Sequence, residues 1–475
     1  MKVRPVFMNI SPLDHRYSCS ERELFESLAR YFSEDAAVRS AVYAEAALVR
    51  AHLAERGLET AALRKLLMEL HTKITPEAVY DEEERTHHFI RALVNVVQRA
   101  LPPEAAQFVH LGATSADILD SALAWRIKAA MREAVLPLLR ALLKKICAIT
   151  KSEAYTPQVG RTHGQHAVPI TLGFAFAGFA ARLGKSVQEI EARSKALCGK
   201  LSGAVGAYNA LTLIYSDCEG FERRFLSEME LEPSEYSTQI VEPEYLLRLL
   251  LEINIAFGII ANLADDLRHL QRSEIGEVRE GFSTSQVGSS TMPQKRNPWN
   301  SEHIKSLWKT FMPRVTTFFL DQISEHQRDL TGSASQRFTG EYITGFAMAA
   351  QRMFNVLEGL DFDRGRLAAN LDSGSIPGGV LAEPAYIMLA ESGIKDAHEI
   401  IRKITLNAES LGISFGEALQ QDESSFKAIE FELKKRRIIG ENEDAGSFFS
   451  KPELYRGLAA EKALSIAKKY MQCEA

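Results

Sequence analysis

Apolar residues recur at intervals of three and four positions along most of this 475-residue sequence. Between Glu21 and about Ala100 the spacing appears at Leu24, Leu28 and Phe32, with Arg, Glu and Lys between the apolar positions. This period places apolar side chains on one face of a helix, whereas the alternation typical of strands is scarce. The pattern therefore predicts an all-α protein.

Three of the predicted helices are long. One covers residues 115–146 with Pro137 as a possible kink, one opens at Pro169, and one covers residues 245–274 and is apolar nearly all round. A helix of about 30 residues cannot bury one whole face within a small monomer. We therefore expect copies of the chain to pack together through these helices as a symmetric homo-oligomer.

The helices are predicted to form three domains. Residues 1–112 form an N-terminal helical domain, and residues 113–361 form a central long-helix bundle that carries a Ser-rich loop. Residues 362–475 contain shorter, more charged helical segments and form the third domain.

Composition excludes several classes of protein. The net charge of −6 and the pI near 6.1 argue against a protein that coats nucleic acid. The five cysteines are odd in number and lack a C-x-x-C pair, so neither a disulfide framework nor a zinc site is encoded. We expect a soluble protein of the reducing cytoplasm.

No membrane segment is expected. The most apolar run, residues 245–263, is interrupted by Arg248, Glu252 and Asn254. The first 17 residues lack a sustained apolar stretch, so no export signal is expected either.

The stretch from Gly288 to Pro298 is the strongest candidate for chemistry. It contains the adjacent Ser289 and Ser290, and it ends in Lys295, Arg296 and Asn297 before a predicted helix. Gly and Ser disfavour helix here, and a helix start attracts anions through its free N–H groups. We expect a loop that binds an anionic ligand; an inert, solvated basic loop is the alternative.

Two other polar segments interrupt the helices. Thr114 or Ser115 can cap the first long helix, and its open N–H groups could also bind a carboxylate. Capping alone would explain both side chains. His163 lies in a Gly-punctuated turn, residues 160–166, where a histidine is more accessible to a cleft than inside a helix.

The longest of these motifs resembles the shared loop of the fumarase, aspartase and argininosuccinase superfamily. Two further regions of that superfamily match in order, at residues 114–120 and 160–165. Within it the chain most resembles the adenylosuccinate lyase family over nearly its full length. The family positions that match are Arg16, Tyr17, Thr86, His87, Ser237, Gln239, Arg328, Asp329, Ser333 and Arg337.

The resemblance implies a carbon–nitrogen lyase of purine biosynthesis. Such an enzyme releases fumarate by β-elimination from adenylosuccinate, giving AMP, and from succinyl-aminoimidazole carboxamide ribotide, giving AICAR. The resemblance also implies a fumarase/aspartase-like fold and a homotetramer whose sites combine three subunits. It implies no metal and no organic cofactor, and the only small-molecule partner is the nucleotide substrate.

Roles for individual residues follow from the same resemblance. Ser289 is the expected base, with Ser290 able to exchange roles, His163 is the acid, and His87 orients the substrate. Lys295 assists the base and, with Thr114, Ser115 and Asn297, binds the succinyl carboxylates. The remaining substrate-binding positions are expected to be Arg16, Tyr17, His110, Gln239, Met292, Arg328, Ser333 and Arg337, with Arg16, Tyr17, Ser333 and Arg337 on the phosphate.

The chemistry gives a separate reason for these residue types. Elimination removes a weakly acidic proton next to a carboxylate, so negative charge accumulates there while the leaving amine must gain a proton. A serine can be the base only where cations, N–H groups and exclusion of water make its alkoxide accessible.

The chain departs from the family pattern in two places. His88 stands where an acidic residue is expected, and Glu242 and Glu244 stand in a segment that usually carries a basic residue. Two rival interpretations are a related fumarate-releasing lyase acting on argininosuccinate, whose loop Gln294 and Lys295 also fit, and a non-catalytic helical structural oligomer.

Overall fold

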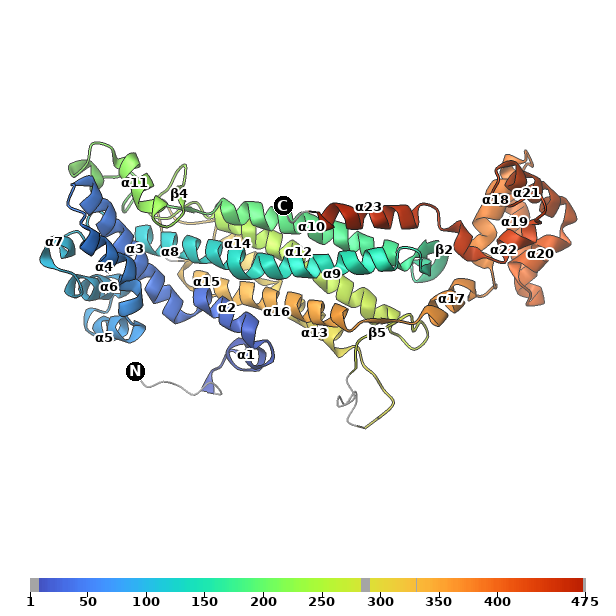
Figure 1. Cartoon of the computed structure of the whole chain (residues 1–475), viewed down its shortest axis with the longest axis horizontal. Coiled ribbons are helices and arrows are strands. Elements are labelled where there is room, and N and C mark those ends of the chain that lie inside the picture. Colours follow the sequence, from blue (N-terminus) through green and yellow to red (C-terminus); the bar gives the residue numbers. More distant parts are fainter. Residues whose placement is uncertain (1–7, 283–290, 330, 473–475) are drawn as a thin grey trace. The chain divides into compact units, whose positions relative to one another are not determined.

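The computed structural model describes residues 8–282, 291–329 and 331–472 (Figure 1). Contacts within the chain divide it into two compact units. The first unit contains residues 1–140, 185–260 and 304–352, and the second contains residues 141–184, 261–303 and 353–475. The prediction of an all-α protein is confirmed, since the strands are short and pair only two by two. The domain boundaries at residues 112 and 361 remain predictions.

The N-terminal part of the first unit is a cluster of helices packed on one apolar core (Figure 1). Its helices are α3 (Glu34–Glu55), α4 (Ala61–Lys73), α5 (Pro76–Thr86), α6 (Phe89–Arg99) and α11 (Cys218–Ser227). Leu48, Leu93 and Phe225 are among the fully buried core residues. The periodicity that predicted helices between Glu21 and about Ala100 therefore marks buried faces, whereas α11 was not predicted.

The first long helix is continuous but not regular. It consists of α8 (Ser115–Ala130), a π-helical turn (Met131–Val135) and α9 (Leu136–Ser152). Pro137 has no N–H to bond with the preceding turn, and a π turn is one way in which a helix accommodates such a defect. The π turn thus lies directly before Pro137, and the kink predicted there stays a prediction.

The other long helices are α10 (Leu172–Lys195), α12 (Glu244–Leu270) and α16 (Thr339–Glu358). In the described part of the chain only α12 is long and apolar enough to span a membrane, judged by length and composition alone. A Cβ on Gly173 would lie 2.5 Å from the Thr150 carbonyl oxygen, and one on Gly184 would lie 2.3 Å from the Tyr470 ring. Small residues of α10 therefore allow its close approach to these neighbours.

The segment before α10 is a β-hairpin of β1 (Pro157–Thr162) and β2 (Gln165–Thr171). The prediction that Pro169 opens the helix is wrong, because Pro169 lies in β2 opposite Val159 and the helix begins at Leu172. A two-stranded ribbon consists only of edge strands, and an edge tolerates a residue without an N–H.

Shorter helices dominate the C-terminal part of the second unit. The helices α18 (Ala382–Glu391), α19 (Ala397–Leu411), α20 (Phe415–Gln421), α21 (Glu423–Lys435) and α22 (Ala445–Phe449) lie together around one core (Figure 1). The shorter helical segments predicted within residues 362–475 are confirmed.

The remaining helices and strands are short. They are α1 (Arg16–Ser20), α2 (Arg22–Phe32), α7 (Pro103–Ala106), α13 (Trp299–Phe311), α14 (Arg314–Leu320), α15 (Ser333–Arg337), α17 (Arg364–Asp372), α23 (Ala459–Met471), β3 (Cys198–Gly199), β4 (Glu232–Pro233), β5 (Val278–Arg279) and β6 (Asp361–Phe362).

Candidate functional site

The predicted site residues are distributed over both units. Those in the first unit are Arg16, Tyr17, His87, His110, Thr114, Ser115, Gln239, Arg328, Ser333 and Arg337. Those in the second unit are His163, Met292, Lys295 and Asn297. Ser289 and Ser290 lie outside the described residues.

Three of the predicted histidines have left-handed backbone conformations. His87 has φ 52°, His110 has φ 61° and His163 has φ 53°. This region costs a residue with a Cβ about 1–2 kcal/mol, and such strain concentrates at functional sites. The three predicted histidines thus share a strained backbone conformation.

His163 lies at the tip of the β1–β2 hairpin. The pair Thr162 and Gln165 closes a two-residue loop in which His163 and Gly164 both have positive φ, at 53° and 74°. This is the geometry of a type I′ turn, whose twist matches that of the two strands. The hairpin therefore presents an exposed imidazole on a short, defined turn.

The base of the hairpin is anchored by a buried carboxylate. Glu277 has no exposed side-chain surface and pairs with Arg161 of β1. It also accepts hydrogen bonds from Gln158 Nε2 at 2.8 Å and Asn370 Nδ2 at 2.9 Å. The strand that leads to His163 is thus held by charged and neutral hydrogen bonds to one residue.

Two polar residues hold both ends of the segment that contains the Ser-rich loop. Glu280 accepts hydrogen bonds from the backbone N–H and hydroxyl of Ser301 at 2.9 and 2.5 Å, at the start of α13. Gln271 accepts from the Glu280 N–H at 2.8 Å and donates to the Arg296 carbonyl at 3.2 Å. Lys295 is exposed between these anchors.

The start of α8 is organised by Asp117. Its carboxylate accepts the Thr114 N–H at 2.8 Å, as expected for a capping residue in the first turn. It also accepts the Ser202 N–H at 3.1 Å and pairs with Lys200, and both side chains of that pair are fully buried. The predicted capping arrangement is confirmed, and whether Thr114 and Ser115 also bind substrate stays a prediction.

His110 and Ser115 line a cavity of about 600 Å³ at the same end of α8. His88 and Arg91 also line it, so the cavity collects groups that can bind an anion. Glu45 of α3 accepts hydrogen bonds from the His110 backbone and ring. Burial alone would lower the pKa of His110, but the hydrogen bond and negative charge of Glu45 outweigh burial and raise that pKa.

His88, the first departure from the family pattern, has a structural role. Its Nδ1 accepts the Arg91 N–H at 3.2 Å and so caps α6. An acidic side chain would serve the same purpose at a helix N-cap. An imidazole thus caps α6 at the position where an acidic residue was expected.

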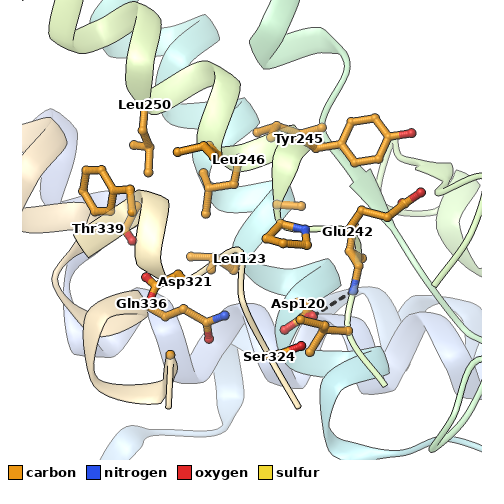
Figure 2. A pocket seen from close by; sticks show the side chains of 18 of the residues that line it. Asp120, Leu123, Glu242, Tyr245, Leu246, Leu250, Asp321, Ser324, Gln336 and Thr339 are labelled. Atoms are coloured by element: carbon orange, nitrogen blue, oxygen red, sulfur yellow. Dashed lines mark hydrogen bonds between the residues drawn. The ribbon is translucent and has the colours of Figure 1, made fainter. Parts of the chain in front are cut away.

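A second cavity, of about 110 Å³, lies between α8, the start of α12 and the chain before α16. Arg328 lines it with Asp120 and Glu242, whereas Gln239, Ser333 and Arg337 belong to the adjoining segments without lining it. Figure 2 shows the Asp120 carboxylate accepting a hydrogen bond from the segment that carries Glu242.

Asp120 holds the segment that contains Gln239. Its Oδ2 accepts the Val241 N–H at 3.2 Å, and the Gln239 N–H donates to the Gln327 carbonyl at 3.4 Å. Burial raises the pKa of Asp120 to about 6, although the Val241 N–H and the charge of Arg328 oppose that shift. The segment is thus fixed from the α8 side and from the side of Arg328.

The predicted phosphate residues occupy two short helices of the first unit. Arg16 and Tyr17 begin α1, and Ser333 and Arg337 are the first and last residues of α15. Positions four apart share a helix face, so Ser333 and Arg337 can address one ligand. Arg16, Ser333 and Arg337 are exposed.

Sequence reasoning missed Glu45, Lys200 and Glu280. The one available signal was Glu45, a charged residue amid the apolar run 44–49, where an unpaired carboxylate would be costly. In the described ranges no group of three His, Cys, Asp or Glu side chains could hold a metal ion.

Two family models match the chain. Residues 15–310 match the model described as Lyase, and residues 324–435 match the model described as Adenylosuccinate lyase C-terminal. The chain is 32% identical to the adenylosuccinate lyase of Pyrococcus abyssi over 461 residues, 96% of each chain. It is 30% identical to that of Archaeoglobus fulgidus over 469 residues, 97% of this chain and 98% of the relative.

Solved structures share the fold. The 3-carboxy-cis,cis-muconate lactonizing enzyme from Pseudomonas putida has a TM-score of 0.79 at 24% identity, covering 95% of this chain and 98% of that one. The fumarate lyase from Mesorhizobium sp. BNC1 has a TM-score of 0.77 at 22% identity, covering 93% and 97%. The predicted fumarase/aspartase-like fold is confirmed.

Proposed function

Since the chain belongs to the adenylosuccinate lyase family of the fumarase/aspartase superfamily, we propose that it releases fumarate from adenylosuccinate, giving AMP. The same elimination on succinyl-aminoimidazole carboxamide ribotide gives AICAR. The chain is a carbon–nitrogen lyase, and the observation that carries the choice of substrate is its identity of 30% or more with adenylosuccinate lyases over nearly its whole length.

The proposed reaction begins with proton removal from the carbon next to a succinyl carboxylate. Ser289 takes this proton, and Ser290 is the alternative base. The ammonium group of Lys295 and the amide of Asn297 bind the carboxylates, which stabilises the negative charge that develops in the transition state. Because proton removal is unfavourable in water, the site must exclude solvent during this step.

His163 donates the proton that the leaving amine needs. A histidine suits this role because its ordinary pKa is near neutral, and the I′ turn supports it on a short, defined backbone. His87 orients the substrate. Thr114 and Ser115 offer hydroxyl groups at the start of α8, where backbone N–H groups also favour a carboxylate.

A phosphate pocket separates a nucleotide substrate from argininosuccinate. We assign the substrate phosphate to Arg16, Tyr17, Ser333 and Arg337. The rest of the nucleotide is assigned to a second group, which consists of His110, Gln239, Met292 and Arg328. The capping role of His88 removes one departure as an argument for another substrate, because the change is explained by α6. A non-phosphorylated substrate gives no reason for a phosphate pocket built from these residues.

We further propose that the enzyme is a cytoplasmic homotetramer with sites shared between subunits. A histidine at an exposed hairpin tip and guanidinium groups on exposed short helices are suited to meeting residues of other copies. No metal or organic cofactor takes part in the proposed mechanism.

The direct test is to mix the purified protein with adenylosuccinate and to follow the ultraviolet change as AMP forms, with argininosuccinate as the comparison. Ser289→Ala should abolish fumarate release and leave substrate binding largely intact. Arg337→Ala should raise KM for the nucleotide strongly. Turnover of argininosuccinate alone, or an unchanged KM in Arg337→Ala, would remove the nucleotide assignment.

A further inference from the structure

Glu45 and His110 form a two-point contact between α3 and the loop before α8. Glu45 Oε2 accepts the His110 backbone N–H at 3.0 Å, and Glu45 Oε1 accepts from His110 Nδ1 at 2.7 Å. The Glu45 side chain is fully buried, whereas the His110 side chain is 21% exposed. One carboxylate therefore fixes both the backbone and the ring of the same residue.

This contact determines which ring nitrogen carries a proton. An ionised carboxylate only accepts hydrogen bonds, so Nδ1 must be the donor. His110 also lines the cavity of about 600 Å³, and Nε2 is the ring nitrogen that the contact with Glu45 leaves available to it. A buried carboxylate without a charged partner is costly, and a protonated His110 supplies that partner.

The backbone of His110 supports the same interpretation. Its φ of 61° is unfavourable for a residue with a Cβ, and the Glu45–His110 N–H hydrogen bond helps to hold that conformation. A ring that served only to fill space would not require a strained backbone and a dedicated buried carboxylate. The arrangement matches that of a histidine held in one orientation for work on a ligand.

The charges around the ring come from three helices. Glu45 lies on α3, Asp117 on α8 and Arg91 on α6, whose N-cap His88 also lines the cavity. Burial lowers the pKa of His110, the hydrogen bond and charge of Glu45 and the charge of Asp117 raise it, and Arg91 opposes them. The net shift is upward, so the imidazolium is favoured.

We propose that Glu45 is a positioning residue that holds His110 with its Nδ1–H fixed, so that Nε2–H donates to an anionic oxygen of the substrate in this cavity. The proposal rests on the proposed lyase function. Glu45 itself touches no substrate. Its effect on turnover passes through His110 alone.

The first test needs no substrate. In the full-length protein, the ring resonances of His110 are assigned by comparison with His110→Gln and titrated by NMR. The parent should show Nδ1 protonated and a His110 pKa above the ordinary value of about 6.5. In Glu45→Gln the pKa should fall below that of the parent, because the negative charge is lost while burial remains.

A matched control is Glu82→Gln. Glu82 is also a buried carboxylate of the same helical cluster, but it bonds Asn95 and Arg99 and not a histidine of the cavity. It should leave the His110 titration unchanged. Glu45→Asp keeps the charge on a shorter arm, so it should lower the pKa by less than Glu45→Gln; this variant serves if Glu45→Gln does not fold.

The second test is the pH profile of kcat/KM for adenylosuccinate. Glu45→Gln should lower kcat/KM about 10- to 100-fold at pH 8, less than the roughly 100- to 1000-fold that outright loss of an oriented donor costs, because the His110 ring remains. The deficit should shrink toward pH 6, where even a lowered pKa leaves more of the imidazolium.

An unchanged His110 titration in Glu45→Gln, or a deficit of equal size at every pH, would reduce Glu45 to a structural role and overturn the proposal. Absence of adenylosuccinate cleavage by the parent would remove the proposed function and leave the NMR titration to decide the role of Glu45.

Discussion

The Lys200 ammonium pairs with the Asp117 carboxylate, and neither side chain has any exposed surface. The same carboxylate bonds the N–H groups of Thr114 and Ser202, so one buried pair joins the start of α8 to the loop after β3. The predicted carboxylate-binding hydroxyls of Thr114 and Ser115 therefore depend on Lys200, which lies 83 positions after Asp117 in the sequence.

Removing one partner of this pair should be costly. Lys200→Met keeps most of the side-chain volume but leaves Asp117 as a buried charge without its cation. We expect a loss of about 3–5 kcal/mol in the free energy of unfolding, measured from urea denaturation. Lys195→Met is the matched control, because Lys195 is 70% exposed and pairs with Glu191 on its own helix. It should change stability by less than about 0.5 kcal/mol. Equal losses in the two variants would contradict the assigned role.

Asp120 offers a test of how the Gln239 segment is held. Asp120→Ala removes the acceptor for the Val241 N–H, whereas Asp120→Asn keeps an oxygen in nearly the same place. Freed of this bond, the segment should place Gln239 less accurately. We expect kcat/KM for adenylosuccinate to fall about 10-fold in Asp120→Ala and to stay near that of the parent in Asp120→Asn at pH 8. Steady-state kinetics of the two variants provide the comparison. Equal kcat/KM values would show that the Asp120–Val241 hydrogen bond is not needed to place Gln239.

The pKa of Asp120 also predicts how stability depends on pH. The pKa is about 6 in the folded protein and 3.8 for an unperturbed carboxyl group, so between these values the folded state binds more protons. The stability contributed by this residue therefore falls as pH rises from about 4 to about 6 and stays lower above that.

Asp120→Asn removes the free-energy cost of ionising Asp120 in the folded protein. It should stabilise the protein by up to about 3 kcal/mol at pH 8 and by much less at pH 4. Urea midpoints of parent and variant at the two pH values measure the difference; a gain that is larger at pH 4 would contradict the sign.

His88 can be tested against the acidic residue that the family resemblance predicted there. Its ring caps α6 by accepting the Arg91 N–H, so His88→Ala should cost about 1 kcal/mol of stability. His88→Asp should retain or improve the cap, since Asp is among the preferred residues at this position. Thermal unfolding midpoints of the three proteins provide the comparison. A midpoint for His88→Asp as low as that of His88→Ala would remove the capping explanation of the departure.

Local signals predicted a large part of this fold. Helical spacing identified the long helices, Pro137 located the irregularity between α8 and α9, and Thr114 with Asp117 identified the start of α8. These features depend on residues close together in the chain. Pro169 misled because a proline suits both the first turn of a helix and an edge strand, and only the pairing with Val159 decides between them.

The polar contacts that position the site were not predictable in this way. Glu45 and His110 are 65 residues apart, and Lys200 and Asp117 are 83 apart. No periodicity joins such positions, because they meet only when separate helices pack on a common core. A charged residue inside an apolar run can be identified as needing a partner, but its partner depends on the tertiary structure.

The turn that carries His163 leads to the last prediction. Gly164 has φ 74° and open space around the position of a Cβ, so Gly164→Ala should cost about 1–2 kcal/mol through backbone strain alone. Gly57 has φ 66° and equally open surroundings, but it lies after α3 and carries no predicted site residue. Gly57→Ala should therefore lose a similar amount of stability while keeping its kcat.

In Gly164→Ala the strained turn shifts the neighbouring imidazole, and we expect kcat to fall about 10-fold or more. The step that protonates the leaving amine should slow more than the step that removes the proton from carbon, because His163 acts in the former. Rates measured where both variants are fully folded separate the two effects, because under these conditions a loss of stability alone leaves kcat unchanged. An unchanged kcat in Gly164→Ala would show that the exact placement of His163 is not needed for turnover.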